Sequence, residues 1–299
     1  MVKMDIKKTI FIIATLLGLW LVSGIFANVF TIADSDMVDP SANVALIKLN
    51  AEITTDSSYN SVSSSDFVRK LDDYSSYPNI KAIIIEINSP GGSPVGSKEI
   101  VDAIKKLRDD KKRNLTVVCY IRDIGASGAY WVASSTEKIY ANELSLVGGI
   151  GVTGSYLEFS GLLDKYNVTY EQLIAGQYKD MGTPLRKLTV DEKNILQRQL
   201  NIMYEIFMHD VAKNRNLSYD YIKNYSNGMV YLGIEAKKYN LIDEFGGKSE
   251  ALEYIKTKIG ADPIVYEPQE EKSLLSSLLG SVMSENPQKA LEEKALPKT

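Results

Sequence analysis

The sequence predicts a layered α/β domain preceded by one membrane-spanning segment. From residue 43 onward, short apolar runs alternate with helical patterns, which is typical of a sheet covered by helices. The apolar runs are too uniformly apolar to lie half-exposed, so they favour central strands that are buried on both faces. Near the N-terminus, the 25 residues at positions 9–33 include no charged side chain.

Residues 9–33 are long enough to cross a membrane as a helix. At a rise of about 1.5 Å per residue, the stretch exceeds the ~30 Å thickness of the hydrocarbon core. A cleaved secretory signal usually has an apolar core of only ~7–15 residues, so an uncleaved anchor is the better interpretation. Three lysines precede the stretch and three aspartates follow it. The positive-inside rule then predicts that residues 1–8 are cytoplasmic and that the domain lies on the extracytoplasmic side of the cell membrane, after a linker at residues 34–42.

The predicted strands and helices follow one another along the chain. Buried strands are predicted at residues 44–49, 80–87, 115–121 and 138–141, and helices at residues 66–74, 94–108, 130–134 and 195–215. Thr189 and Glu192 have the spacing of a capping box ahead of the last helix. Residues 218–258 supply further short helices and turns, so the predicted domain spans residues 43–266.

The C-terminal segment, residues 267–299, differs in character from the domain. Leucine, valine and methionine side chains recur at helical spacing between residues 274 and 283, with serines on the opposite face, which predicts an amphipathic helix of about three turns. Packing on the parent domain, contact with the membrane surface and contact with a neighbouring subunit all fit such a helix. Residues 286–299 are polar, and we expect them to be disordered.

Composition restricts the chemistry. The net charge of −4 and the absence of a basic stripe argue against a nucleic-acid partner. The single cysteine, Cys119, lies in an apolar run and is predicted to be a small buried hydrophobe. The single histidine, His209, lies within a helical pattern among apolar residues, where a structural role is favoured. A hydrolase built on this sequence would therefore need a base other than imidazole.

Two glycine-rich turns each follow a predicted buried strand. The carboxyl ends of parallel strands are where open α/β sheets bind ligands. Residues 88–92 read Asn-Ser-Pro-Gly-Gly and offer unobstructed backbone N–H groups, although a plain tight turn is the alternative. Residues 125–129 read Gly-Ala-Ser-Gly-Ala and place Ser127 just ahead of a helix, where it is either a nucleophile or an ordinary N-cap.

The third segment of interest, residues 176–182, contains Lys179. Most lysines are solvated surface charges. A neutral lysine can serve as the base for a serine when its surroundings disfavour the ammonium form.

In this order, the blocks resemble the signal peptide peptidases of the SppA type, which are serine–lysine peptidases with the ClpP/crotonase fold. The resemblance covers roughly residues 43–262. It rests on residues 88–92, 126–130 and 178–180, and on the 52-residue separation of Ser127 and Lys179. A closing motif, from Gly228 through residues 233–236 and 241–243 to residues 246–247, resembles the end of the family domain.

The resemblance implies a mechanism and a setting. Ser127 is expected to attack the scissile carbonyl and Lys179 to take its proton, with the backbone N–H groups of Gly92 and Gly128 as oxyanion donors. Neither a metal nor a cofactor is implied. Family members cut hydrophobic peptides, notably signal-peptide remnants in the membrane, and form ring-like homo-oligomers in which neighbouring subunits help to shape the cleft.

The sequence also departs from the family pattern. Many members have a serine that hydrogen-bonds the lysine amine at the position of Gly149, which leaves Ser145, a backbone carbonyl or a water to orient Lys179. Met229 and Leu232 replace polar residues that are common in the closing motif.

Three other functions remain to be weighed against a general peptidase of this kind. One is a serine–lysine protease devoted to a single membrane-protein partner. Another is an inactive scaffold that binds hydrophobic peptides, which the Gly149 departure favours. The third, an acyl-CoA enzyme of the crotonase type, fits the fold but not an exported location, because CoA esters are cytoplasmic.

Overall fold

The computed structural model describes residues 15, 17–18, 38–58 and 60–268. The chain divides into two compact units, Met1–Tyr266 and Glu267–Thr299, and only the first is described over most of its length. The predicted membrane segment at residues 9–33 lies almost wholly outside the described residues, as does the predicted amphipathic helix after residue 268. Among the helices that are described, none is both long enough and apolar enough to cross a membrane.

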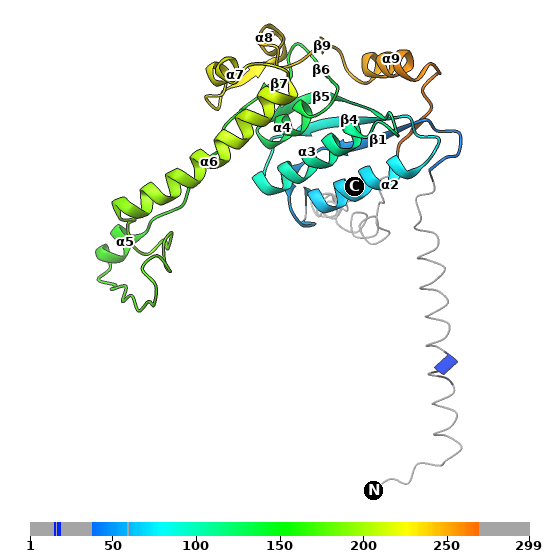
Figure 1. The fold of residues 1–299 in the computed structure, drawn as a ribbon. Helices are drawn as coiled ribbons and strands as arrows, with labels where there is room; N and C mark the ends of the chain where they lie inside the picture. The colour runs from blue at the N-terminus through cyan, green and yellow to red at the C-terminus, as the bar shows by residue number, and fades with distance from the viewer. Residues whose placement is uncertain (1–14, 16, 19–37, 59, 269–299) are drawn as a thin grey trace, which may run out of the picture. The chain divides into compact units, whose positions relative to one another are not determined.

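A largely parallel sheet forms the centre of the domain (Figure 1). Its strands run in the order β10-β1-β4-β5-β6-β9, and every pair along this path is parallel. The strands are β1 (Val44–Leu49), β4 (Ala82–Ser89), β5 (Thr116–Ala126), β6 (Lys138–Ala141), β9 (Glu244–Phe245) and β10 (Val265–Tyr266). This architecture confirms the predicted α/β class.

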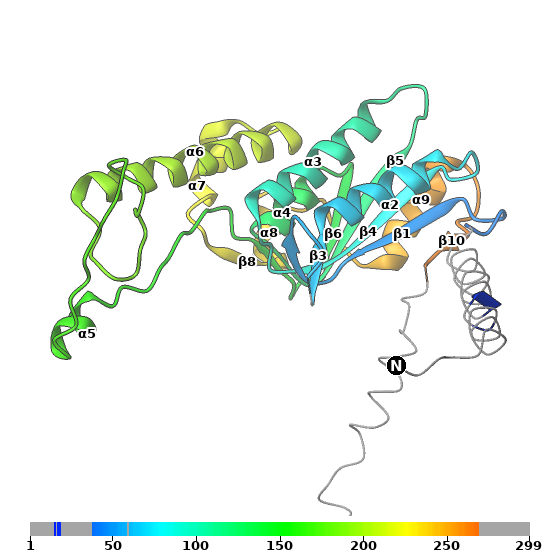
Figure 2. The ribbon, with the colours of Figure 1, turned by 90° about the horizontal axis from the view of Figure 1, so that it is seen from below.

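Helices cover both faces of the sheet (Figures 1 and 2). One face packs against α2 (Ser64–Ser76), α3 (Pro94–Asp109) and α4 (Gly128–Ser134), and the other packs against α9 (Lys248–Ile259). Successive side chains of a strand point to opposite faces. Ile83 and Ile85 of β4 therefore lie in the first core, whereas Ile84 lies in the second.

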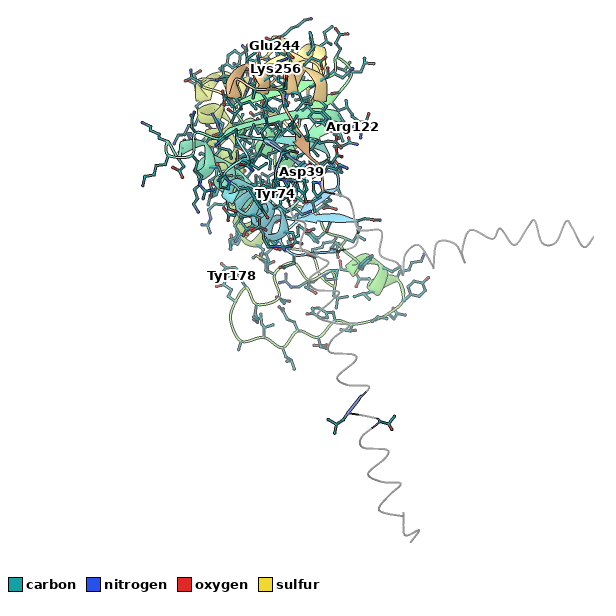
Figure 3. All side chains as sticks on the ribbon, turned by 90° about the vertical axis from the view of Figure 1, so that its right-hand side faces the viewer. Asp39, Tyr74, Arg122, Tyr178, Glu244 and Lys256 are labelled. Atoms are coloured by element: carbon teal, nitrogen blue, oxygen red, sulfur yellow. The ribbon has the colours of Figure 1, made fainter. Side chains whose placement is uncertain are left out.

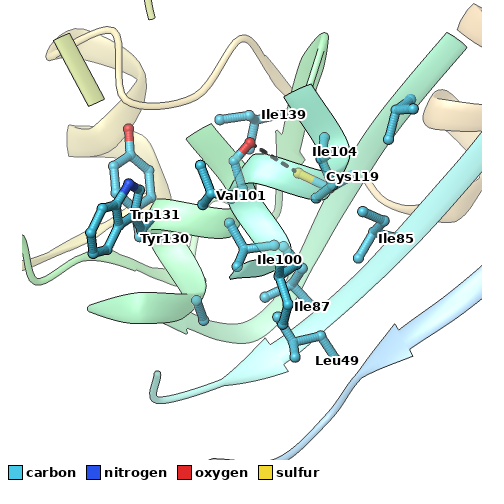
Figure 4. Packing of buried hydrophobic residues seen from close by; sticks show 14 of the residues in the cluster. Leu49, Ile85, Ile87, Ile100, Val101, Ile104, Cys119, Tyr130, Trp131 and Ile139 are labelled. Carbon is cyan, nitrogen blue, oxygen red and sulfur yellow. Dashed lines mark hydrogen bonds between the residues drawn. The ribbon is translucent and has the colours of Figure 1, made fainter. Parts of the chain in front are cut away.

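Cys119 lies in the larger of the two hydrophobic cores. Figure 4 places Cys119 of β5 among Ile85, Ile104 and Ile139. Its side chain is fully buried, and burial raises the pKa of the thiol to about 12. The prediction that Cys119 is a small buried hydrophobe is confirmed.

The third predicted strand is longer than expected. We predicted that it would end at residue 121 and be followed by an irregular turn, but β5 continues to Ala126. The reason is a change of partner. Residues Ile124–Ala126 pair with β7 (Leu146–Gly148), and β7 in turn pairs with β8 (Val230–Leu232) in antiparallel fashion. Ser127 therefore follows directly after a central strand.

A long extension, residues 154–189, leaves the body of the domain between β7 and α6 (Val190–Asn214); we call it the arm. The arm contains α5 (Ser160–Lys165), and in Figures 1 and 2 it lies at the end of α6 that is far from the sheet. The helix α6 begins five residues before the predicted start, because Thr189 and Glu192 form the capping box that their spacing indicates.

The remaining elements are short. They are β2 (Glu52–Thr54) and β3 (Ser61–Ser63), which pair with each other, and the helices α7 (Tyr219–Tyr225) and α8 (Gly233–Lys238). The β2 strand touches the glycine-rich turn after β4 through one parallel bridge, Ile53 to Gly92. That contact holds the turn whose Gly92 lines the cavity described below.

Candidate active site

Ser127 has a backbone conformation that few residues other than glycine adopt. It joins β5 to α4 with φ 52° and ψ −127°, a conformation that costs about 1–3 kcal/mol and persists only where the surrounding structure enforces it. Here the Ser127 N–H donates to the Gly148 carbonyl oxygen at 2.8 Å. The Ser127 side chain makes no capping hydrogen bond to α4. The alternative of an ordinary N-cap therefore does not describe this serine.

The Gly92 N–H faces away from the strand beside it. The bridge to β2 uses the Gly91 carbonyl, which accepts from Ile53 N–H at 2.8 Å, and the Ser93 N–H, which donates to the Ile53 carbonyl at 2.8 Å. In a parallel bridge of this kind, the N–H of the central residue points to the other side. A Cβ at position 92 would lie 2.2 Å from the Ile53 carbonyl oxygen, so the turn needs glycine.

Gly128 supplies a second donor close to the first. It is the first residue of α4, and N–H groups in a first helical turn have no acceptor within the helix. A Cβ at position 128 would lie 2.1 Å from Ser97 Oγ and 3.4 Å from the Gly92 nitrogen. The close approach of Ser97 on α3 therefore requires glycine here, and the backbone nitrogen of Gly92 lies close to Gly128.

These three residues line one cavity of about 740 Å³. Its apolar wall comes from α4, α6 and β8 and includes Trp131, Leu200, Phe207 and Val230. The rings of Trp131 and Phe207 are stacked with centroids 4.7 Å apart. Trp131 is one helical turn after Ser127 and projects from α4 beside Tyr130 (Figure 4).

A hydrogen bond to a charged residue holds the Trp131 ring in place. Its Nε1–H donates to Asp210 Oδ2 at 3.2 Å. The Asp210 carboxylate is held in turn by Lys98 Nζ at 3.5 Å and Lys105 Nζ at 3.6 Å, both from α3. The aromatic wall therefore has a fixed position. The sequence did not predict this wall, because nothing in the local pattern distinguishes Trp131 from an ordinary core residue.

Lys179 does not join the cavity within the chain. It lies on the arm with an exposed side chain and is not among the residues that line the cavity around Ser127. Figure 3 places Tyr178, the preceding residue, on a loop outside the body of the domain. The structure brings Ser127, Gly92 and Gly128 together and leaves Lys179 apart from them.

The surroundings of position 149 explain why this residue is glycine. Gly149 lines the cavity with φ +62°. A Cβ there would lie 3.2 Å from the Ser127 nitrogen and 3.3 Å from a methyl group of Val230. Ser145, one of the groups we considered for orienting Lys179, does not line this cavity. Its hydroxyl is buried, accepts from Asn142 N–H and donates to the Arg122 carbonyl.

The closing motif has a structural role. Asp243 accepts a hydrogen bond from Ile139 N–H of β6 at 2.7 Å and pairs with Arg215 at 2.8 Å. The Leu241 carbonyl accepts from the hydroxyl of Tyr130 on α4 at 2.9 Å. The motif therefore ties β6 and α4, and so the neighbourhood of Ser127, to the end of the domain.

His209 is remote from this chemistry. Its side chain is exposed and stacks on Tyr219 with ring centroids 4.4 Å apart, and it does not line the cavity around Ser127. Among the residues that the structure describes, no cluster of histidine, cysteine and carboxylate side chains is placed to hold a metal ion.

An ion cluster at the base of the arm was also missed from the sequence. Arg186 donates to both oxygens of Asp180 at 3.0 and 2.7 Å, and to both oxygens of Glu192 at 2.9 and 2.6 Å. The Glu192 side chain is only 3% exposed. The hydrogen bonds from Arg186 lower the pKa of Glu192 to about 2 and also lower the pKa of Asp180. We call these three residues the arginine clamp.

Comparisons with known proteins agree with this geometry. Residues 109–262 match the model of peptidase family S49. A candidate protease of Methanocaldococcus jannaschii is 35% identical over 190 residues, which cover 64% of this chain and 60% of that protein. A candidate signal peptide peptidase SppA of Enterococcus faecium is 32% identical over 208 residues, covering 69% of this chain and 60% of that protein.

A third relative is the chloroplastic serine protease SPPA of Arabidopsis thaliana. It is 31% identical over 179 residues, which cover 60% of this chain and 26% of that protein. The chain therefore spans less than two thirds of the length of each of these relatives.

Proposed function

The chain belongs to peptidase family S49, and from this we propose that it is a serine endopeptidase with Ser127 as nucleophile and Lys179 as general base. The observation that carries the proposal is the geometry of Ser127. Its strained backbone and the absence of a capping bond to α4 leave the hydroxyl in the cavity that Gly92 and Gly128 also line, and the backbone N–H groups of these two glycines are the proposed oxyanion donors. Such preorganised donors stabilise the negative oxygen of a tetrahedral intermediate.

The proposed reaction has two halves. Ser127 Oγ attacks the scissile carbonyl while its proton passes to Lys179 Nζ, and the oxyanion accepts hydrogen bonds from Gly92 and Gly128. Lys179 then gives the proton to the leaving amine, and an acyl-enzyme remains on Ser127. A water molecule, deprotonated by Lys179, hydrolyses the ester and restores the serine.

We further propose that Lys179 reaches Ser127 of a neighbouring subunit. The arm holds Lys179 outside the cavity of its own chain. The arm also exposes many large apolar side chains, including Leu157, Leu162, Tyr166, Val168 and Leu173. Exposed apolar groups in such number are typical of a surface that another protein covers. A homo-oligomer would cover them and complete the dyad.

The apolar cavity supports hydrophobic peptides as the substrate class. Trp131, Leu200, Phe207 and Val230 would surround a side chain next to the scissile bond, and signal-peptide remnants are peptides of this kind. An anchor at residues 9–33, with the domain on the extracytoplasmic side of the cell membrane, would place the site near such remnants. A protease for a single membrane protein would use the same cavity with a narrower range of substrates.

An inactive scaffold is the second candidate function. The separation of Lys179 from Ser127 within the chain and the missing side chain at Gly149 favour it. A scaffold would bind hydrophobic peptides in the cavity and leave them intact.

Labelling with a serine-directed fluorophosphonate and hydrolysis of apolar peptides together separate these candidates. We expect the wild-type oligomer to be labelled and active, and Ser127→Ala to lose both properties while remaining folded. Lys179→Arg should be as inactive as Lys179→Ala, because arginine keeps its proton. His209→Gln is the control and should keep full activity. A folded wild-type oligomer that is neither labelled nor active would support the scaffold.

A further inference from the structure

We infer that Arg186 is a positioning residue for the base: it holds Asp180, and through it the backbone of Lys179, against the first turn of α6. This inference rests on the proposed function of Lys179. It adds a residue that neither contacts the cavity around Ser127 nor takes part in proton transfer.

The clamp joins a fixed end to the segment that carries the base. Glu192 is the fixed end, because it is buried and also accepts from Thr189 N–H at 2.8 Å in the capping box of α6. Asp180 is the other end, and it is the residue next to Lys179 along the chain. A planar guanidinium can donate to two carboxylates at once in fixed directions, which a lysine ammonium cannot do.

Backbone hydrogen bonds around Lys179 link its position to that of Asp180. The Lys179 N–H donates to the Gly176 carbonyl at 3.1 Å, and the Thr183 N–H donates to the Asp180 carbonyl at 3.0 Å. The lysine therefore lies within consecutive tight turns. When the Asp180 side chain is fixed, the turns leave the Lys179 backbone little freedom to move independently.

No other feature of the arm fixes the lysine as firmly. Residues 154–187 are all described and none of them is buried, and the buried residue of the arm is Leu188, next to α6. Apolar burial therefore acts at the base of the arm and not around Lys179. Among the described residues, one ion pair joins the arm to the rest of the chain, that of Arg186 with Glu192, and Arg186 also pairs with Asp180 inside the arm. Without Arg186, two carboxylates would face each other at the base of the arm and repel.

Hydrolysis kinetics on the full-length oligomer test this inference. The variants are Arg186→Gln and Asp180→Asn, with Arg198→Gln as the matched control. Arg198 lies on α6 and makes no ion pair with any residue that the structure describes. We expect kcat to fall by about 10- to 100-fold in both clamp variants, with KM within about twofold, because misplacing a catalytic group by about 1 Å has effects of this size. Arg198→Gln should match the wild type.

Two further variants separate positioning from a general loss of structure. Arg186→Lys keeps the positive charge but loses the paired hydrogen bonds to both carboxylates, so its kcat should be as low as that of Arg186→Gln. The double variant Asp180→Asn/Arg186→Gln should be no slower than the slower single variant, because both changes break one interaction. Each variant is compared per folded subunit, with thermal unfolding and oligomer size measured alongside.

The outcomes are distinct. An active wild type in which Arg186→Gln keeps the kcat of Arg198→Gln would overturn the inference and leave the proposed function intact. A kcat that falls only in proportion to the loss of folded oligomer would also overturn it. An inactive, unlabelled wild type would instead contradict the proposed function itself.

Discussion

The body of the domain and the arm hold their functional residues by different means. Ser127 sits at the end of a buried central strand, where backbone hydrogen bonds and the close approach of α3 determine its geometry. Lys179 sits on an extension with exposed apolar side chains, held at its base by three charged residues. The proposed nucleophile and its proposed oxyanion donors therefore line one cavity within the chain, whereas the proposed base lies outside that cavity.

The strongest test of this difference is complementation between two inactive variants. Ser127→Ala and Lys179→Ala should each be inactive alone. In mixed oligomers made by co-expression in equal amounts, about a quarter of the sites should combine an intact serine with an intact lysine from the next subunit, if subunits associate head to tail. Peptide hydrolysis by the mixture should then recover to about a quarter of the wild-type rate.

The control is the same mixture made from separately purified oligomers that do not exchange subunits. It should stay inactive. If co-expressed oligomers were also inactive while both variants remained folded and assembled, the lysine would have to act within its own chain, and the comparison between body and arm would lose its functional meaning.

A smaller effect is expected when the oxyanion turn is altered in the body. Gly92→Ala places a methyl group 2.2 Å from the Ile53 carbonyl oxygen, so the backbone must shift and the Gly92 N–H must move. We expect kcat to fall by about 10²- to 10³-fold. We also expect the free energy of unfolding to fall by about 1–3 kcal/mol, measured by denaturant titration. Gly247→Ala is the control, because a Cβ there meets open space; equal effects in both variants would contradict this role for the turn.

The aromatic wall should control which side chain the cavity accepts. Trp131→Leu removes the stack on Phe207 and the bond to Asp210, which enlarges the cavity. We expect the ratio of kcat/KM for peptides with a large apolar residue over those with a small one to rise about tenfold. Phe245→Leu removes an exposed aromatic ring elsewhere and should leave the ratio unchanged. An unaltered ratio in a folded Trp131→Leu would place the specificity outside this wall.

The arm should also respond to acid more than the body does. Glu192 has an ordinary pKa of 4.5 and a folded-state pKa of about 2. A carboxyl whose pKa is lowered on folding stabilises the folded form above its ordinary pKa, and this contribution is lost as the pH falls through the folded value. The clamp should therefore weaken between about pH 4.5 and pH 2. This should be seen as a fall in the protection factors for amide hydrogen exchange in residues 176–187 that β4 and β5 do not show. In Arg186→Gln the exchange of the arm should already be fast at pH 6; slow exchange there would mean that other contacts hold the arm.

Local sequence patterns predicted much of the body correctly. Uniform apolar runs gave the central strands, and the glycine-rich turns marked the ends of β4 and β5. The extension of β5 to Ala126 was missed, because pairing with β7 depends on residues about twenty positions away. The capping box at Thr189 was found because its two residues interact across one helical turn.

The arm and its clamp were much harder to predict. Its residues have no apolar periodicity that indicates where they lie, and Arg186 is six positions from each of its partners, Asp180 and Glu192. A motif identified Lys179 as a candidate base, but no local pattern indicated that the structure would hold it away from Ser127. The wall at Trp131 depends on contacts between α4 and α6, which are far apart in the sequence.

The distance between the arm and the cavity around Ser127 has a consequence for control of proteolysis. If two copies must meet to complete each site, a newly made single copy is inert, and diluting the protein below its assembly constant abolishes turnover without any inhibitor. Specific activity would then rise with the local concentration of the protein. A cell could thus confine cleavage to places where this protein accumulates, and no propeptide would be needed to keep it silent.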